Sequence, residues 1–214
     1  VGTARIVKVS ASDVELFLGD PGANGVPEPP ATADADSDDR GLVFFGGTGS
    51  LLLTPAGVAA SVSGTLKLRL GAVDFSLGDG LYVALQVNTT PSPVVDASLG
   101  LDLPAGTFLR VQIGQTGNPA AVTAFGQSIG GIFAFEQVTS AGPDAVLNTT
   151  DDVRVLRIQG SQISLFVGDD GGTPGTTATD LADDVGLRLS DGSILLLITP
   201  EGIESGPVYP LASA

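Results

Sequence analysis

The feature that most constrains the fold is an unbroken alternation of apolar and polar residues from Val58 to Leu70. Even positions carry Val, Ala, Leu or Gly, while the odd positions after Ala59 carry Ser, Thr, Lys or Arg. A period of two is typical of a β-strand with one buried face. Leu51 to Leu53 precede it, and Thr54-Pro55-Ala56-Gly57 has the Pro and Gly of a tight turn. The stretch 50–70 therefore predicts a strand, a turn and a long strand whose even-numbered face is buried.

The composition extends this prediction to the whole chain. Hydrophobic residues make up 43% of 214 residues, which is enough for a substantial core in one large domain or two small ones. The 30 Gly and 14 Pro have no three-residue period and indicate many turns. Good helix formers are scarce, and no helical periodicity of useful length is present. An all-β fold is expected.

Similar sequence segments recur along the chain. Residues 5–9 and 13–20, which we interpret as two strands joined by a short turn, are matched by residues 154–158 and 163–169. LLLTPAGV from Leu51 to Val58 is likewise matched by LLITPEGI from Leu196 to Ile203. These pairs indicate a repeat on the order of 150 residues, with a finer repeat of roughly 67 to 69 residues inside it. Repeats of this kind stack on their neighbours, so an elongated molecule is predicted.

The repeats divide the chain into four predicted parts. Residues 1–40 end a preceding unit, 41–105 and 106–185 form β half-units A and B, and 186–214 begin a further unit. Further strands are expected at residues 81–87, 99–103, 108–113, 122–125 and 129–138, with a β-bulge at Gly71-Ala72 and a hairpin turn at residues 78–80. Such short connections cannot hold crossover helices. We predict tandem antiparallel repeats in an elongated sandwich or solenoid-like stack, with a parallel β-helix as the alternative.

The residue types argue against an enzyme. The chain has no His and no Cys, which removes Ser-His-Asp and Cys-His arrangements and His-ligated zinc. A Ser-Lys dyad is disfavoured because Lys8 and Lys67, the only lysines, lie on the polar sides of predicted strands. A glycosidase-like acid pair needs one carboxyl in an apolar or charge-crowded pocket, whereas the acids here cluster in Gly/Ser/Thr-rich loops. No catalytic residue is assigned.

The net charge of −15 restricts the partners of the chain. A field of this sign repels nucleic acid and anionic lipid headgroups. No apolar run is long enough to span a bilayer, and the first residues lack the pattern of a signal peptide, so we expect no membrane insertion and interpret the chain as a mature product or a segment of something longer.

The acidic loops are candidate calcium sites. Asp34-Ala35-Asp36-Ser37-Asp38-Asp39 has the alternate spacing by which an oxygen-rich loop surrounds a hard cation, although the Gly and the distal Glu of an EF-hand are absent. Two further loops share an early aspartate and a closing Asp-Asp pair. The full set of candidate ligands is Asp20, Asp34, Asp36, Asp38, Asp39, Asp144, Asp151, Asp152, Asp169, Asp183 and Asp184. Solvated acidic turns that aid solubility are the other interpretation, and both stay open.

Several segments resemble the β-strand repeats of very large secreted or cell-surface bacterial proteins of the adhesin-like kind. The segments are LTPAGVAASVSGTLKL, VALQVNTT, LPAGTFLRV, FGQSIGGIFAFEQV and RVLRIQGSQISLFVGD, which together cover much of the chain. The resemblance implies one segment of an extracellular filamentous protein, rigidified by calcium. It carries no functional residue over to this sequence. The Asn-Thr-Thr triplets at 88 and 148 fit the glycosylation sequon, but turns explain them better in a bacterial protein.

These observations lead to one expectation and two rivals. We expect a non-enzymatic structural or adhesive repeat module of an extracellular bacterial surface or filament protein, with Ca²⁺ as its candidate cofactor and copies of itself or neighbouring repeat units as partners. The first rival is a module that binds a surface glycan or a protein through the loops at residues 20–40 and 169–185. The second is a self-assembling filament or surface-layer subunit whose edge strands pair between copies.

Overall fold

A computed structural model of the chain describes residues 5–23, 25, 39–69, 75–76, 80–124, 127–140, 144, 146, 149–169 and 185–205. This described part of the chain consists of strands and turns without a helix, as the composition predicts. Accordingly, none of the described segments is a helix with the length and hydropathy needed to cross a bilayer. The expected bulge at Gly71-Ala72 and most of the turn at residues 78–80 lie outside the described residues.

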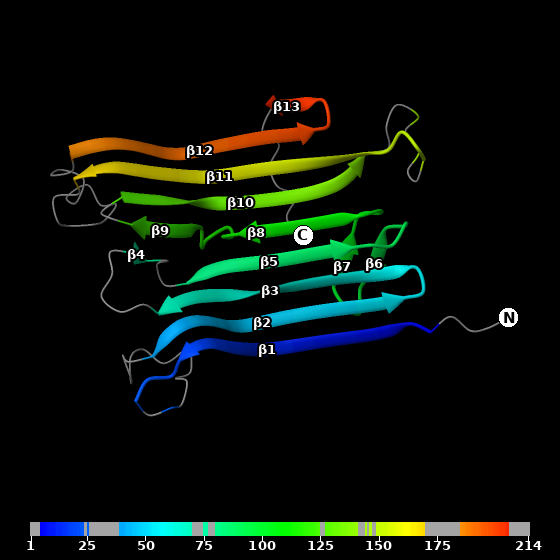
Figure 1. Cartoon of the computed structure of the whole chain (residues 1–214), viewed down its shortest axis with the longest axis horizontal. Coiled ribbons are helices and arrows are strands. Elements are labelled where there is room, and N and C mark those ends of the chain that lie inside the picture. Colours follow the sequence, from blue (N-terminus) through cyan, green and yellow to red (C-terminus); the bar gives the residue numbers. More distant parts are fainter. Residues whose placement is uncertain are drawn as a thin grey trace.

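The strands form one wide antiparallel sheet and a small hairpin (Figure 1). In chain order they are β1 (Val7–Asp20), β2 (Arg40–Thr54), β3 (Gly57–Arg69), β4 (Phe75–Ser76), β5 (Leu81–Asn88), β6 (Val94–Asp96), β7 (Leu101–Leu103), β8 (Phe108–Ile113), β9 (Ala120–Ala124), β10 (Gln127–Ser140), β11 (Val153–Asp169), β12 (Val185–Thr199) and β13 (Gly202–Ser205). The main path runs β1-β2-β3-β5-β8-β10-β11-β12-β13, with β9 beside β10 and β4 beside β9, while β6 and β7 pair with each other.

Every pairing between described strands is antiparallel. The all-β antiparallel prediction is confirmed, and the alternative of a parallel β-helix is wrong. The physical reason is the connections, because a two-residue hairpin turn can join only antiparallel neighbours. The sheet is open, with β1 at one edge and β13 at the other. The predicted division at residues 40/41, 105/106 and 185/186 stays a prediction.

The predicted strand-turn-strand around residues 50–70 is confirmed. β2 and β3 are joined at Thr54-Pro55-Ala56-Gly57, where the Thr54 hydroxyl accepts from the amide of Ala56 at 3.2 Å and donates to the carbonyl of Gly57 at 3.1 Å. The turn between β12 and β13 has the same chemistry, with Thr199 bonded to Glu201 and Gly202. A hydroxyl that satisfies the turn backbone explains why both reversals begin with Thr.

Two predicted turns are bulges instead. Residues 5–9 and 13–20 were expected to be two strands, but β1 runs through both, with a register shift against β2 and a left-handed φ of 53° at Asp13. β11 is continuous in the same way, with a φ of 51° at Gln162. One left-handed residue adds an unpaired position and bends a strand, whereas a reversal needs a pair of turn residues. The polar Ser-containing segments therefore mark bends within long strands.

The small hairpin covers one part of one face of the sheet. Leu101 and Leu103 of β7 pack with Leu52, Ala59 and Phe108 in a buried cluster. Val94, Leu99 and Val138 lie against this cluster and are partly buried. Of the strand expected at residues 99–103, only Leu101–Leu103 is β-structure, because residues 97–100 form the turn that joins β6 and β7. This cluster is one part of the core; other buried hydrophobic residues, among them Val43, Ile132 and Leu195, lie in strands outside it.

Candidate functional site

The most distinctive surface of the molecule is one face of the main sheet. Residues directly opposite each other in a sheet lie on the same face. The register therefore defines three rows that cross the strands. The rows are Val9-Leu51-Ala60-Val87-Leu109-Gln137-Leu156-Ile198-Ile203, then Val62-Leu85-Val111-Phe135-Ile158-Leu196, then Val83-Ile113-Phe133-Gly160-Ile194. We call these residues the apolar face; Gln137 is their only polar member, and none is charged.

The opposite face of the same strands has another chemistry. One row there reads Ser10-Ser50-Ser61-Gln86-Arg110-Glu136-Arg157. Arg157 and Glu136 form an ion pair of 2.9 Å within this row. We call this side the polar face; the β6–β7 hairpin packs on it through Leu52 and Ala59. The two faces therefore differ along this row from β1 to β11, whereas Leu195 and Leu197 of β12 and Ile132 and Ala134 of β10 also lie on the polar face.

The apolar face is only partly buried in the described chain, and several of its large side chains are exposed. Val62 and Leu85, which lie opposite each other in β3 and β5, are 43% and 44% exposed, and Ile203 at the β13 edge is 71% exposed. The prediction that even positions of residues 58–70 are buried is thus wrong for Val62, while Ala59 on the polar face is fully buried. Alternation identifies the apolar face of a strand, whereas burial also needs a second layer, and the only layer in the described residues covers the other face.

Two glycines on the apolar side of the sheet leave space that large neighbouring side chains occupy. The ring of Phe44 lies over Gly64, where an added Cβ would overlap it. At Gly160, an added Cβ would come within 2.8 Å of both Ile163 and Ile194. The missing side chains of the two glycines are therefore replaced by neighbouring rings and branched chains.

The structure describes six of the predicted calcium ligands and brings only some together. Asp20 ends β1 and accepts a hydrogen bond from the amide of Gly22 at 3.1 Å. Asp39 is buried and forms an ion pair of 2.7 Å with Arg69. Asp169 ends β11 opposite Val185. Asp34, Asp36, Asp38, Asp183 and Asp184 lie outside the described residues.

The third acidic loop brings Asp144, Asp151 and Asp152 into one hydrogen-bonded turn. The amide of Asp144 donates to Asp151 at 3.4 Å, and the Thr149 hydroxyl lies 2.6 Å from Asp151 and 3.3 Å from Asp152. The hydrogen bond from Thr149 lowers the pKa of Asp151, and the backbone amides add to this effect. Among the described residues, no group of three or more acidic side chains has the geometry of a metal site. The calcium prediction therefore stays a prediction.

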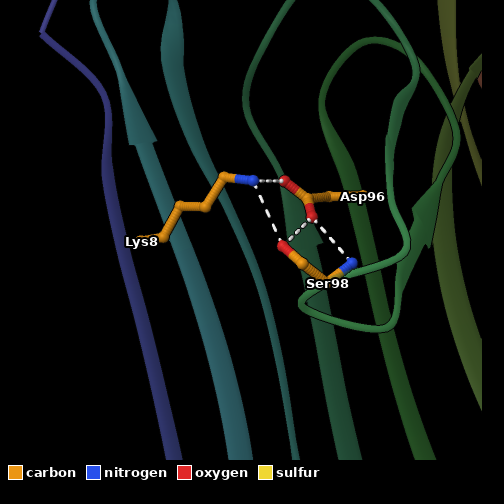
Figure 2. Close-up of polar contacts among 3 residues, drawn as sticks. All are labelled: Lys8, Asp96 and Ser98. Carbon is orange, nitrogen blue, oxygen red and sulfur yellow. Dashed lines mark hydrogen bonds and ion pairs between the residues drawn. The ribbon is translucent and has the colours of Figure 1, made fainter.

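Lys8 ties the edge strand to the hairpin (Figure 2). Its ammonium group reaches from the polar face of β1 to the Asp96 carboxylate at 2.5 Å and to the Ser98 hydroxyl at 3.2 Å. The amide and hydroxyl of Ser98 also donate to Asp96. Lys8 first, and then Ser98, lower the pKa of Asp96 to about 2. This cluster was not predicted, since nothing in the sequence pairs residues almost ninety positions apart.

Asn88, the first residue of one sequon, is a structural residue. Its side chain is fully buried, donates to the carbonyls of Ser92 and Pro104, and accepts from the amide and hydroxyl of Thr90. A side-chain amide in this position is closed to glycan attachment. The preference for a turn over a glycosylation site fits this geometry. The second sequon residue, Asn148, lies outside the described residues.

A shallow polar cavity of about 310 Å³ lies beside this network. It is lined by Thr89, Thr90, Pro91, Gly106, Thr107, Thr139, Asp152 and Arg154. Hydroxyls, one carboxylate and one guanidinium could hydrogen-bond to a small polar ligand. Sequence reasoning missed this cavity because its lining comes from four separate segments.

Comparison with protein-family models, with curated proteins and with solved structures finds no match for the chain. The arguments for its function therefore rest on the sheet and its surfaces. The apolar face is the surface that the strand register defines best.

Proposed function

We propose that the chain is a structural, non-enzymatic β-module of an extracellular bacterial surface or filament protein, in which a second β-layer packs on the apolar face. The observation that carries the proposal is the width of that face, whose first row crosses all nine strands from β1 to β13 and whose three rows contain no charged residue. Monomeric soluble proteins rarely expose apolar patches larger than a few hundred Å². Covering this one would complete a two-layer sandwich with the sheet spacing of about 10 Å.

Matched features at the two ends of the sheet support a repeat module. β1 and β11 carry left-handed residues at equivalent places in similar sequences, Asp13 and Gln162. Gly19 faces Gly41 between β1 and β2, and Gly168 faces Gly186 between β11 and β12. The turns that begin with Thr54 and Thr199 have the same hydrogen bonds. Two copies of one strand-bulge-turn design, placed in one sheet, are what a tandem β-repeat predicts.

Cysteine labelling in the producing cells tests this proposal. The chain has no Cys, so single variants at Leu85 on the apolar face and at Asn118 in an exposed turn report one position each. A membrane-impermeant maleimide should label Asn118→Cys on intact cells, and should label Leu85→Cys only after denaturation. Labelling of Asn118→Cys only in lysates would reject an extracellular module. Equal labelling of both variants on intact cells would reject a covered apolar face.

A binding module is the second candidate, and the polar cavity is the observation that favours it. Glycan hydroxyls pair well with Thr hydroxyls, a carboxylate and a guanidinium, all of which line this cavity. Arg154→Ala should then abolish binding on a glycan array without changing the melting temperature. An array without hits for the unmodified chain would discard this candidate.

A further inference from the structure

We infer that the second layer is a second copy of this chain, so that two sheets associate through their apolar faces in a symmetric dimer. The inference rests on the proposed function, because it names the partner of the same surface. The alternating sequence predicts that this face is buried, whereas the structure leaves part of it exposed. The two observations agree if another molecule supplies the missing layer. A second copy offers the same nine-strand width and the same apolar rows.

The area of the face is sufficient for a stable dimer. Nine strands spaced by about 4.8 Å are roughly 38 Å wide, and the eight residues of β5 give roughly 25 Å of length, or about 950 Å². A standard stable interface needs about 800 Å² from each partner.

The placement of charge permits this association in spite of the net charge of −15. The three rows of the apolar face bury no charge when two copies meet, because their only polar residue is Gln137. Charged strand residues such as Lys8, Arg110 and Glu136 lie on the polar face and stay in water. An interface without buried charge avoids the penalty of taking charges out of water, and only the long-range repulsion between the two acidic copies, which salt screens, opposes association.

Geometry favours a closed pair over an open chain of molecules. Twisted sheets pack face to face with their strands about 30° apart, and two identical twisted sheets satisfy this requirement about a two-fold axis. An isologous contact uses the apolar face of both copies completely and leaves none for a third. Because β8 is the middle strand of the nine, greatest overlap places the axis near Val111.

The test is sedimentation equilibrium of the purified chain from nanomolar to high micromolar concentration. We expect a monomer–dimer equilibrium. The double variant Val62→Lys/Leu85→Lys, at two half-exposed positions of the apolar face, should raise the dissociation constant roughly 100-fold or more by burying unpaired charge. The control Ser61→Lys/Gln86→Lys changes the neighbouring paired residues on the polar face and should leave the constant within about threefold.

Three outcomes would overturn the inference. A chain that stays monomeric at all concentrations would reject the dimer. If that monomer binds a fluorescent apolar dye and the apolar-face double variant does not, the proposed function survives without the dimer. Species larger than a dimer would reject the closed pair, and equal effects of both double variants would place the interface elsewhere. Far-UV circular dichroism of each variant, together with the single variant Leu85→Lys, separates loss of association from loss of folding.

Discussion

Asn88 holds together three parts of the chain near the hairpin. Its four side-chain hydrogen bonds reach Thr90, Ser92 and Pro104, and the carbonyl of Thr90 accepts from the amide of Gly106 at 3.0 Å. A fully satisfied buried amide of this kind fixes one backbone path into the hairpin and one path out. The triplet Asn-Thr-Thr is thus explained by local structure.

Replacing Asn88 by Ala should destabilise the fold by about 2–3 kcal/mol, because it leaves buried carbonyl and amide groups without partners. Urea unfolding followed by circular dichroism measures this loss. Asn118→Ala, in the exposed turn between β8 and β9, is the matched control and should change stability by less than about 0.5 kcal/mol. Equal losses in the two variants would contradict the role assigned to Asn88.

Opposed glycines make a second prediction at this scale. An added Cβ at Gly168 would lie within 2.5 Å of the Cα of Gly186, and one at Gly19 would lie 2.7 Å from the Cα of Gly41. Backbone cannot move aside as a side chain can, so Gly168→Ala should destabilise the fold by about 2 kcal/mol or more. The control Gly49→Ala, whose Cβ would meet only ordinary contacts of 3.4 and 3.7 Å, should be nearly neutral. Urea midpoints of both variants decide the point.

Elements were predicted well where periodicity alone sets them. Residues 108–113 match β8, and the strands around 81–87 and 129–138 are β5 and β10 with small extensions. The errors lie where one residue decides between a bend and a reversal, as at Asp13 and Gln162. The β6–β7 hairpin was not predicted as a covering element, because its place over Leu52 and Ala59 depends on contacts between distant segments.

The hairpin should loosen in acid. Contact with Lys8, and then with Ser98, lowers the pKa of Asp96 to about 2, so the folded state favours the ionised carboxylate. A lowered pKa gives stability that is complete above the ordinary value of 3.8 and is lost as the pH falls through about 2. Urea midpoints between about pH 5 and pH 2 should therefore fall more steeply for the unmodified chain than for Lys8→Met. Lys67→Met, which also removes one charge from the polar face, should keep the steep dependence.

The calcium hypothesis predicts a higher melting temperature at millimolar Ca²⁺, because a ligand that binds only the folded state stabilises it. Asp151→Asn should abolish the shift if the loop of Asp144, Asp151 and Asp152 is the site, and should leave it intact if the site is in another acidic loop. Ala121→Ser, at an exposed position, is a control for mutation itself. An unchanged melting temperature in Ca²⁺ would reject the hypothesis for every loop.

At the scale of the whole molecule, the sequence predicts a sheet with one apolar side but not the number of layers. The same alternation serves a sheet covered by its own chain and one covered by a partner, since both need apolar side chains at every second position. The row through Val62, Val111 and Leu196 follows from a register that single strands do not encode. The apolar face could therefore be predicted strand by strand, and its width only from the structure.

Higher ionic strength should strengthen the dimer, because both copies carry a net negative charge. Two copies bring together a net charge of −15 each, while the interface itself contains no ion pair from the three rows. Salt screens the repulsion and does not weaken apolar contact. Raising NaCl from about 0.05 to 0.5 M should lower the dissociation constant several-fold in sedimentation. Weaker association at high salt would indicate that ion pairs hold the copies together.

The order of strands also decides how the molecule responds to force. The path begins at β1 on one edge and ends at β13 on the other, so tension applied between these two edge strands acts across the sheet (Figure 1). The hydrogen bonds of an antiparallel pair lie along that direction and would break one after another, as in unzipping. A single sheet would thus peel strand by strand under low load. A second sheet bound to the apolar face would contact several strands at once. Pulling one strand away would then also require breaking its contacts with the second layer, so the two-layer molecule would resist a higher force than the single sheet.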